Sequence, residues 1–171
     1  MSKTQISLHK RNLIVLIITA GVVGADQLIK YFVDVYLKPI EVITFIPKVL
    51  QFRYLENDGA MMGFMNGRTE LMTALSIICF VPVAALIFMG KIKNKVDYVS
   101  LVMIICGGLG NIIDRIFRGY VIDYIEVLFV DFYVFNFADC LVTVGAFLLL
   151  FNQIYQIFKE HKAKKGVVSD G

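Results

Sequence analysis

Residues 98–116 read YVSLVMIICGGLGNIIDRI, an apolar run that closes on an amide, an acid and a base. About 20 mostly apolar helical residues cross the hydrocarbon core of a bilayer, so this run predicts a transmembrane helix. The glycine pair at 107–108 is typical of close helix packing inside membranes. Polar residues at membrane depth are costly and mark either function or a contact between helices. The polar residues here are Asn111, Asp114 and Arg115.

The rest of the chain has the same character. It is 58% hydrophobic and 18% charged, with a mean hydropathy of +0.73, which is too apolar for an ordinary soluble domain. Residues 13–32, 71–90 and 137–158 are three further runs long enough to span a membrane. We therefore expect residues 1–171 to form one domain, an all-α integral membrane protein with four transmembrane helices.

The basic residues are distributed by side of the membrane. They precede the first span, fill the loop between the second and third, and follow the fourth. The positive-inside rule places these three segments, with the tail 159–171 and both termini, in the cytoplasm. The loops 33–70 and 117–136 then face outward. Because the basic residues are not gathered on one surface, the net charge of +3 does not indicate a nucleic-acid partner.

Three of the expected helices carry polar residues to a common depth. Asp26 lies about 21 Å along the first helix from Asn12, and Lys30 follows one turn later. Asn111 lies about 20 Å along the third helix, while Asp139 lies near the start of the fourth, which runs the other way. A polar cluster near the outer surface is the expected result. A purely structural interpretation also remains open, in which these residues form i, i+4 pairs that close the bundle, Asp26 with Lys30 and Asn111 with Arg115.

The outer loops contain strand patterns. Residues 49–54 alternate apolar and polar side chains, which is the period of a half-buried strand, and Asn57-Asp58-Gly59 is a turn signal. Residues 120–135 are rich in Val, Ile, Tyr and Phe and predict a strand or two, with Asp123 on one of them. We therefore expect a small extracytoplasmic β-sheet.

Few residues on the outer side can do chemistry. His9 and His161 both fall on the cytoplasmic side, which removes Ser-His and Cys-His catalysis and His-ligated zinc from the outer site. The remaining option is a pair of carboxylates, Asp123 and Asp139, that share one proton and activate water. This chemistry needs no cofactor, and we expect no metal.

At this point the motifs resemble those of lipoprotein signal peptidase, the type II signal peptidase of bacteria, over essentially the whole chain. In order they are Asp26-Gln27-x-x-Lys30, Asn57-x-Gly59-Ala60, Gly110-Asn111-x-x-Asp114-Arg115, Val121-Ile122-Asp123-Tyr124 and Phe135-Asn136-x-Ala138-Asp139. The resemblance implies an aspartyl endopeptidase of the bacterial plasma membrane, active at the outer face. Its substrates would be prolipoproteins, cut before a diacylglyceryl-modified cysteine, with membrane lipid as the other partner.

The resemblance also implies roles for individual residues. Asp123 and Asp139 match the catalytic aspartates, and Asp26 and Lys30 match a supporting pair. The positions that bind substrate or shape the site are Asn57, Gly59, Asn111, Asp114, Arg115, Asn136 and Ala138. The sequence departs from the family pattern in two places. Met61-Met62 replace a small residue followed by an aromatic one, which concerns the shape of the substrate groove. Cys140 replaces a serine, which concerns the hydrogen bonding at Asp139.

Two other functions compete with this one. A small carrier or channel would use Asp26, Asp114 and Asp139 as an ion path, but it would need charges through the full membrane depth, and the inner halves of the spans are almost wholly apolar. A structural assembly factor would not need acids at a common depth.

Overall fold

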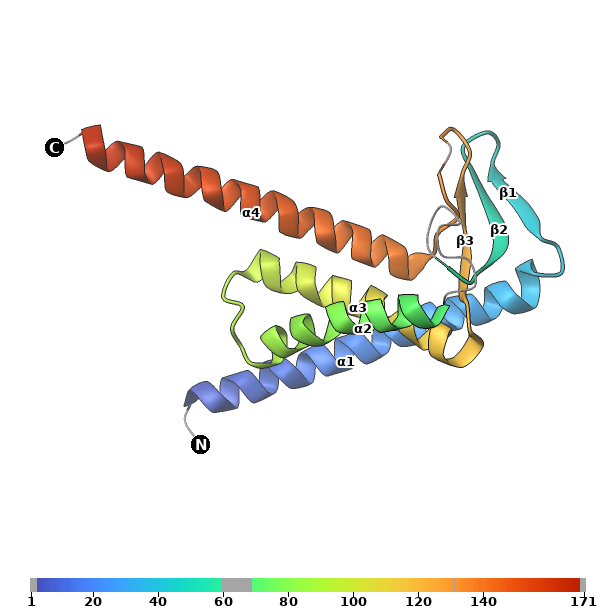
Figure 1. The fold of residues 1–171 in the computed structure, drawn as a ribbon, viewed down its shortest axis with the longest axis horizontal. Helices are drawn as coiled ribbons and strands as arrows, with labels where there is room; N and C mark the ends of the chain where they lie inside the picture. Colours follow the sequence, from blue (N-terminus) through green and yellow to red (C-terminus); the bar gives the residue numbers. More distant parts are fainter. Residues whose placement is uncertain (1–2, 60–68, 131, 170–171) are drawn as a thin grey trace.

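The computed structural model describes residues 3–59, 69–130 and 132–169. These residues form four long helices and a three-stranded antiparallel sheet at one end of them (Figure 1). The helices are α1 (Lys3–Phe32), α2 (Thr69–Phe88), α3 (Lys95–Arg118) and α4 (Phe137–Ser169), and the strands are β1 (Val42–Ile46), β2 (Leu50–Asn57) and β3 (Val121–Val127). All four helices are long and apolar enough to cross a membrane, which confirms the expected fold class.

Helix α3 is the centre of the bundle and contacts the other three helices. In α3, 44% of the apolar membrane-spanning segment is buried inside the protein. The corresponding shares are 17% in α1, 6% in α2 and 11% in α4. The apolar side chains of the outer helices therefore remain available to lipid, as expected in a membrane, where a helix that faces hydrocarbon has no need of a polar face.

Glycines allow α3 to approach its neighbours closely. A Cβ on Gly107 would clash with the carbonyl oxygen of Ala138 on α4, and one on Gly110 would lie 2.6 Å from a carboxylate oxygen of Asp26 on α1. A Cβ on Gly108 would meet nothing within 4 Å. The sequence therefore predicted the close packing correctly, but only two of these three glycines provide it.

The end of α3 leads directly into the sheet. Gly119 ends the helix in the left-handed conformation, with a φ of 82°, and its N–H donates to the carbonyl of Arg115. Glycine adopts this conformation without the steric cost that a Cβ would impose. β3 begins two residues later, so the residues at its start lie beside the end of α3.

The sheet has the order β1-β2-β3, with β2 antiparallel to both neighbours. It lies at the end of the bundle opposite both chain termini, which we call the sheet end (Figure 1). β2 and β3 confirm the strands expected in residues 49–54 and 120–135, whereas β1 was not expected.

Several helix ends differ from the predicted spans. α1 begins at Lys3 rather than at residue 13, α2 and α3 are each displaced or extended by two or three residues, and two helices continue further than expected. α1 continues past Phe32 through a π-helical turn, η1 (Val33–Leu37), whose Leu37 is buried against the sheet residues Ile122 and Tyr124. α4 continues through residues 159–169, which were expected to be a tail, because the Lys, Glu and Ala residues there are good helix formers.

Candidate active site

Asp123 lies in the buried first half of β3, with 1% of its surface exposed. Each of its carboxylate oxygens accepts a hydrogen bond from an amide side chain. Nδ2 of Asn136 lies 2.6 Å from Oδ1, and Nδ2 of Asn57 lies 2.8 Å from Oδ2. Asn57 reaches this position because it is the last residue of β2, which is paired with β3.

Asp139 lies in the first turn of α4 and takes part in a reciprocal cap of that helix. Oδ1 of Asn136, the residue before the helix, accepts from the backbone N–H of Asp139 at 2.9 Å, and Oδ2 of Asp139 accepts from the backbone N–H of Asn136 at 3.1 Å. This is a capping box, which satisfies two backbone donors at a helix start. A negative charge at this position is also stabilised by the helix dipole.

Asn136 therefore joins the two acids. Its Oδ1 and its backbone N–H bind Asp139, while its Nδ2 donates to Asp123. The separation of Asp123 and Asp139 is thus set by one short side chain, although the two acids are 16 positions apart in the sequence.

Asn111 on α3 extends this network toward α1. Its Nδ2 donates to Oδ1 of Asp139 at 2.7 Å, and its Oδ1 accepts from Nδ2 of Asn136 at 3.2 Å and from Nζ of Lys30 at 2.9 Å. Of the two i, i+4 pairs in the purely structural alternative, Asp26 with Lys30 is present. Asn111 does not pair with Arg115 among the described contacts, because both ends of its amide are bonded to other elements.

Behind Asn111 lies a buried network of charges. Nζ of Lys30, with no exposed surface, lies 2.9 Å from Oδ2 of Asp26 and 2.6 Å from Oδ2 of Asp114. Oδ1 of Asp114 accepts from Gln27 and from Arg118. Gln27 and Arg118 were not among the predicted site residues, although Gln27 belongs to a quoted motif and Arg118 follows Asp114 by four positions, the spacing of neighbours on a helix.

Two small residues shape this end of the bundle. The backbone N–H of Gly59 donates to Oδ1 of Asn57 at 3.2 Å, which fixes the Asn57 amide with its Nδ2 free to bind Asp123. Ala138 is fully buried against Gly107 and Gly110, where a larger side chain would push α4 away from α3.

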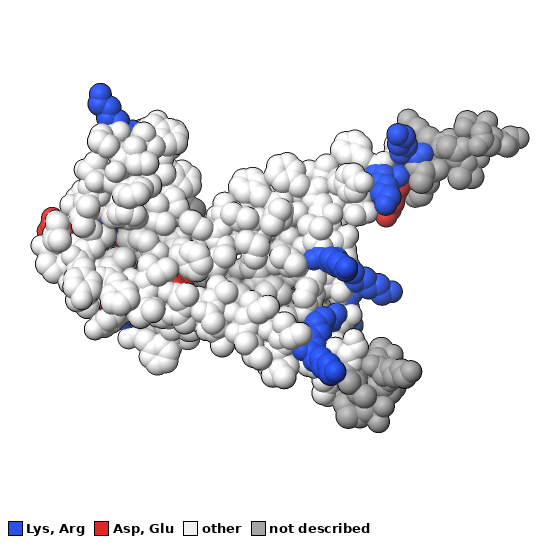
Figure 2. All heavy atoms as spheres, turned by 180° about the vertical axis from the view of Figure 1, so that it is seen from behind, with Lys and Arg blue, Asp and Glu red and all other residues white. Residues whose placement is uncertain are grey.

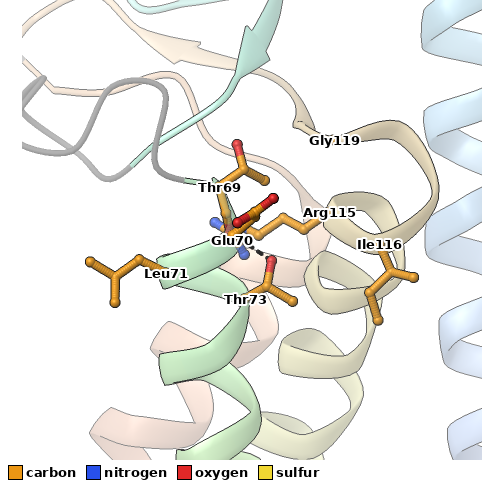
Figure 3. A pocket seen from close by; sticks show the side chains of 7 residues that line it. All are labelled: Thr69, Glu70, Leu71, Thr73, Arg115, Ile116 and Gly119. Atoms are coloured by element: carbon orange, nitrogen blue, oxygen red, sulfur yellow. Dashed lines mark hydrogen bonds between the residues drawn. The ribbon is translucent and has the colours of Figure 1, made fainter.

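Arg115 lines a pocket between the end of α3 and the start of α2 (Figure 3). Its Nε has no hydrogen-bond partner among the described residues. Its positive charge is close enough to Asp139 and Asp123 to interact with both. The residues that line the pocket are Thr69, Glu70, Leu71, Thr73, Arg115, Ile116 and Gly119.

Of the departures from the family pattern, Met61 and Met62 lie outside the described residues. Cys140 is a half-buried free thiol next to Asp139, and its backbone N–H donates to the carbonyl of Asn136. The thiol makes no hydrogen bond to Asp139 among the described contacts, so the capping box forms without a hydroxyl at this position.

The surroundings of Asp123 favour its protonated form. Burial, followed by the negative charge of Asp139, raises the pKa of Asp123 to about 7, although the hydrogen bonds from Asn57 and Asn136 act in the opposite direction. Near neutral pH Asp123 therefore keeps its proton for a large part of the time, as a general acid must.

A buried pair of carboxylates at one end of a four-helix membrane bundle is an arrangement that acid–base hydrolysis can use. The chain belongs to the signal peptidase II family, since the family model described as Signal peptidase (SPase) II matches residues 18–155. It is therefore a multi-pass membrane peptidase.

Individual relatives agree with this assignment. A lipoprotein signal peptidase of Lactobacillus johnsonii is 37% identical over 95% of this chain and 99% of its own length. One from Streptococcus pneumoniae is 33% identical over 82% of this chain and 92% of its own. Among solved structures, a bacterial membrane enzyme determined by the in meso method at 2.3 Å resolution is 28% identical and superposes with a TM-score of 0.76, covering 84% of this chain and 88% of the other.

Proposed function

We propose that this peptidase removes the signal peptide from bacterial prolipoproteins by cleaving before the diacylglyceryl-modified cysteine, with Asp123 and Asp139 as its catalytic pair. The substrate class is supported by relatives that are named lipoprotein signal peptidases. The observation that carries the catalytic assignment is the bonding of both acids to the single side chain of Asn136.

The first half of the reaction adds water to the scissile carbonyl. One carboxylate takes a proton from water as the water oxygen bonds to the carbonyl carbon, and the other aspartate gives its proton to the carbonyl oxygen. The product is a neutral tetrahedral diol. No negative charge accumulates on the former carbonyl oxygen, which matters in a site that is shielded from water.

The second half breaks the peptide bond. The aspartate that took the proton from water gives it to the leaving nitrogen as the carbon–nitrogen bond breaks, and the other aspartate recovers a proton from a hydroxyl of the diol. The products are a carboxyl group and a free amine on the modified cysteine, and the pair is left with one proton, ready for another cycle.

The other site residues hold this pair and its substrate. Asn57 and Asn136 orient Asp123, and Asn111 orients Asp139, through the hydrogen bonds given above. Arg115 is suited to bind a backbone carbonyl of the substrate, because its guanidinium reaches the pocket beside the pair and its Nε has no partner among the described residues.

The orientation in the membrane follows from the distribution of charge. Figure 2 shows that Lys and Arg gather at the end of the helices opposite the sheet. By the positive-inside rule, this distribution supports an orientation with that end and both termini in the cytoplasm and with the sheet and the acids at the outer face. The diacylglyceryl chains of the substrate would stay in the lipid beside the apolar outer surface of the helices while the scissile bond reaches the acids.

The test is the cleavage of a synthetic prolipoprotein peptide by the full chain in detergent, with and without the diacylglyceryl group on its cysteine. The modified peptide should be cut at the bond before the cysteine, and the unmodified peptide should be cut far more slowly. Equal cleavage of both, or cleavage at another bond, would contradict the proposed substrate class.

A further inference from the structure

The contacts of Lys30 link the buried ion pairs of the helix bundle to the proposed catalytic residues. Its ammonium group has three N–H donors, and three acceptors lie within hydrogen-bond distance: Asp26 at 2.9 Å, Asp114 at 2.6 Å and Oδ1 of Asn111 at 2.9 Å. Two of these contacts are ion pairs, and the third is with an amide that itself touches Asp139.

The charges around Lys30 cancel. Asp26 and Asp114 contribute two negative charges, and Lys30 and Arg118 contribute two positive charges. The network as a whole carries no net charge. Lys30 acts on Asp139 through its positive charge and also through Asn111, whose amide contacts both groups.

Lys30 provides the shorter of two hydrogen bonds to the oxygen of the Asn111 amide and so favours one orientation of that amide. Its ammonium donates to Oδ1, and so does Nδ2 of Asn136 at 3.2 Å, so the oxygen end of the amide faces two donors and the NH₂ end faces Asp139. With the amide reversed, the NH₂ group would face the ammonium and the oxygen would face a carboxylate. Both contacts would be repulsive, and only one orientation satisfies every group.

The two acids are therefore in different surroundings. Asp139 receives the oriented Asn111 amide and a backbone N–H at the start of α4, where the helix dipole also favours a negative charge. Asp123 lies on a strand and accepts hydrogen bonds from two side-chain amides, and among the described contacts it accepts none from a backbone N–H at the start of α4. These contacts favour the charged form of Asp139 over the charged form of Asp123.

We propose that Lys30 is a positioning residue for the peptidase reaction: by fixing the Asn111 amide with its NH₂ toward Asp139, it makes Asp139 the carboxylate that activates water and leaves the shared proton on Asp123. This inference rests on the catalytic pair proposed above, and it assigns the two acids different roles.

Other charged and titratable groups also face Asp139. Arg115 on α3 and Asp123 and Tyr124 on β3 lie near enough to interact with it electrostatically, as do Lys30 on α1 and Cys140 on its own helix. A test of Lys30 must therefore separate its hydrogen bond to Asn111 from a general loss of positive charge.

The variants Lys30→Met and Arg118→Met make that separation. Each removes a cation that binds Asp114, but only Lys30 touches Asn111. Lys30→Met alone leaves two buried acids, Asp26 and Asp114, with one cation, Arg118. The variant to be measured therefore combines Lys30→Met with Asp26→Asn, which keeps the network neutral. The readout is the pH profile of kcat and KM for cleavage of a diacylglyceryl prolipoprotein peptide by the full chain.

The double variant Asp26→Asn, Lys30→Met should lower kcat by roughly 10-fold to 100-fold with KM nearly unchanged, since misplacement of a reacting group has effects of this size. The acidic limb of its kcat profile should move upward by about half a pH unit or more, because a less stabilised carboxylate is protonated more easily. Arg118→Met should leave the acidic limb in place. A double variant whose limb stays where it is in the parent chain would overturn the inference.

A second variant tests the path from Lys30 through Asn111 to Asp139 at its middle residue, and by itself it does not require the double variant to fold. Asn111→Leu removes the amide and leaves Lys30 with both of its carboxylate partners. It should move the acidic limb in the same direction, and adding the double substitution to it should produce no further movement, because the two act through one path. An unshifted limb in Asn111→Leu contradicts the inference by itself. Cleavage by Asp123→Asn and Asp139→Asn at the parent rate would instead contradict the catalytic pair.

Discussion

Nδ2 of Asn136 lies 2.6 Å from Oδ1 of Asp123, and the same asparagine caps the helix that carries Asp139. The start of α4 and the proposed catalytic pair are therefore one structure. Fraying of this helix end would move Asp139 away from Asp123, so the stability of the cap and the activity of the site are linked.

Substitution at position 136 can separate these two effects. Asn136→Ala should lose the cap and the bond to Asp123, with a cost of about 1 kcal/mol in stability and a large loss of kcat. Asn136→Ser keeps an oxygen that can cap α4 but cannot reach Asp123 as the amide does. It should recover most of the melting temperature without recovering kcat. Equal recovery of both would show that the asparagine acts only as a cap.

Replacement of either acid by its amide should stop catalysis and leave the fold intact. Asp123→Asn and Asp139→Asn should each lower kcat by roughly 10²-fold to 10⁴-fold or more, the range expected for the loss of a general acid or base. Asp34→Asn, at a half-exposed acid on η1, is the matched control and should retain activity. Cleavage assays and thermal melting in the same detergent provide both measurements, and normal turnover by either amide variant would rule out the pair.

The raised pKa of Asp123 predicts a fall in activity on the alkaline side. Because burial raises this pKa to about 7, a reaction that needs the proton of Asp123 should slow as pH rises through about 7. Asn57→Ala removes a hydrogen bond that lowers this pKa, so its alkaline limb should move to higher pH. An alkaline limb that is unchanged in Asn57→Ala would contradict the assignment of this limb to Asp123.

The same pKa has a consequence for stability. The folded-state value of about 7 lies above the ordinary value of 3.8, so between these pH values the folded protein binds a proton that the unfolded chain releases. The contribution of Asp123 to stability is thus fully present below about pH 4 and is lost as pH rises through about 7. Asp123→Asn should show a weaker fall in melting temperature over this range than the parent chain, and parallel curves would contradict this.

Packing between α3 and α4 can be tested at two neighbouring glycines. Gly107→Ala should push α4 from α3, because its Cβ would meet the backbone of Ala138, and it should reduce both the melting temperature and the activity. Gly108→Ala faces open space and should be neutral or stabilising, by up to about 1 kcal/mol, since alanine favours a helix more than glycine does. Similar losses in the two variants would mean that the helices do not pack as described.

Much of the fold could be predicted from local patterns. The four spans follow from apolar length, and β2 and β3 follow from alternation and from β-branched and aromatic content. Strand β1 was missed because its sequence, VITFI, shows no alternation of apolar and polar side chains, and in the structure all five residues are exposed. The continuation of α1 through η1 was missed because it depends on the burial of Leu37 against the sheet.

By itself, the sequence determined which chemistry is available at the site and its depth, since residue types and distance along a helix are local properties. Only the tertiary structure decided which of these side chains form hydrogen bonds and ion pairs with one another. Asn111 binds Asp139 and Lys30 rather than Arg115, and Arg118 and Gln27 join Asp114. The physical reason is that a hydrogen bond depends on the rotation of each helix about its axis and on the closeness of its neighbours. Here these were set by packing at Gly107 and Gly110, far along the chain from Asp139.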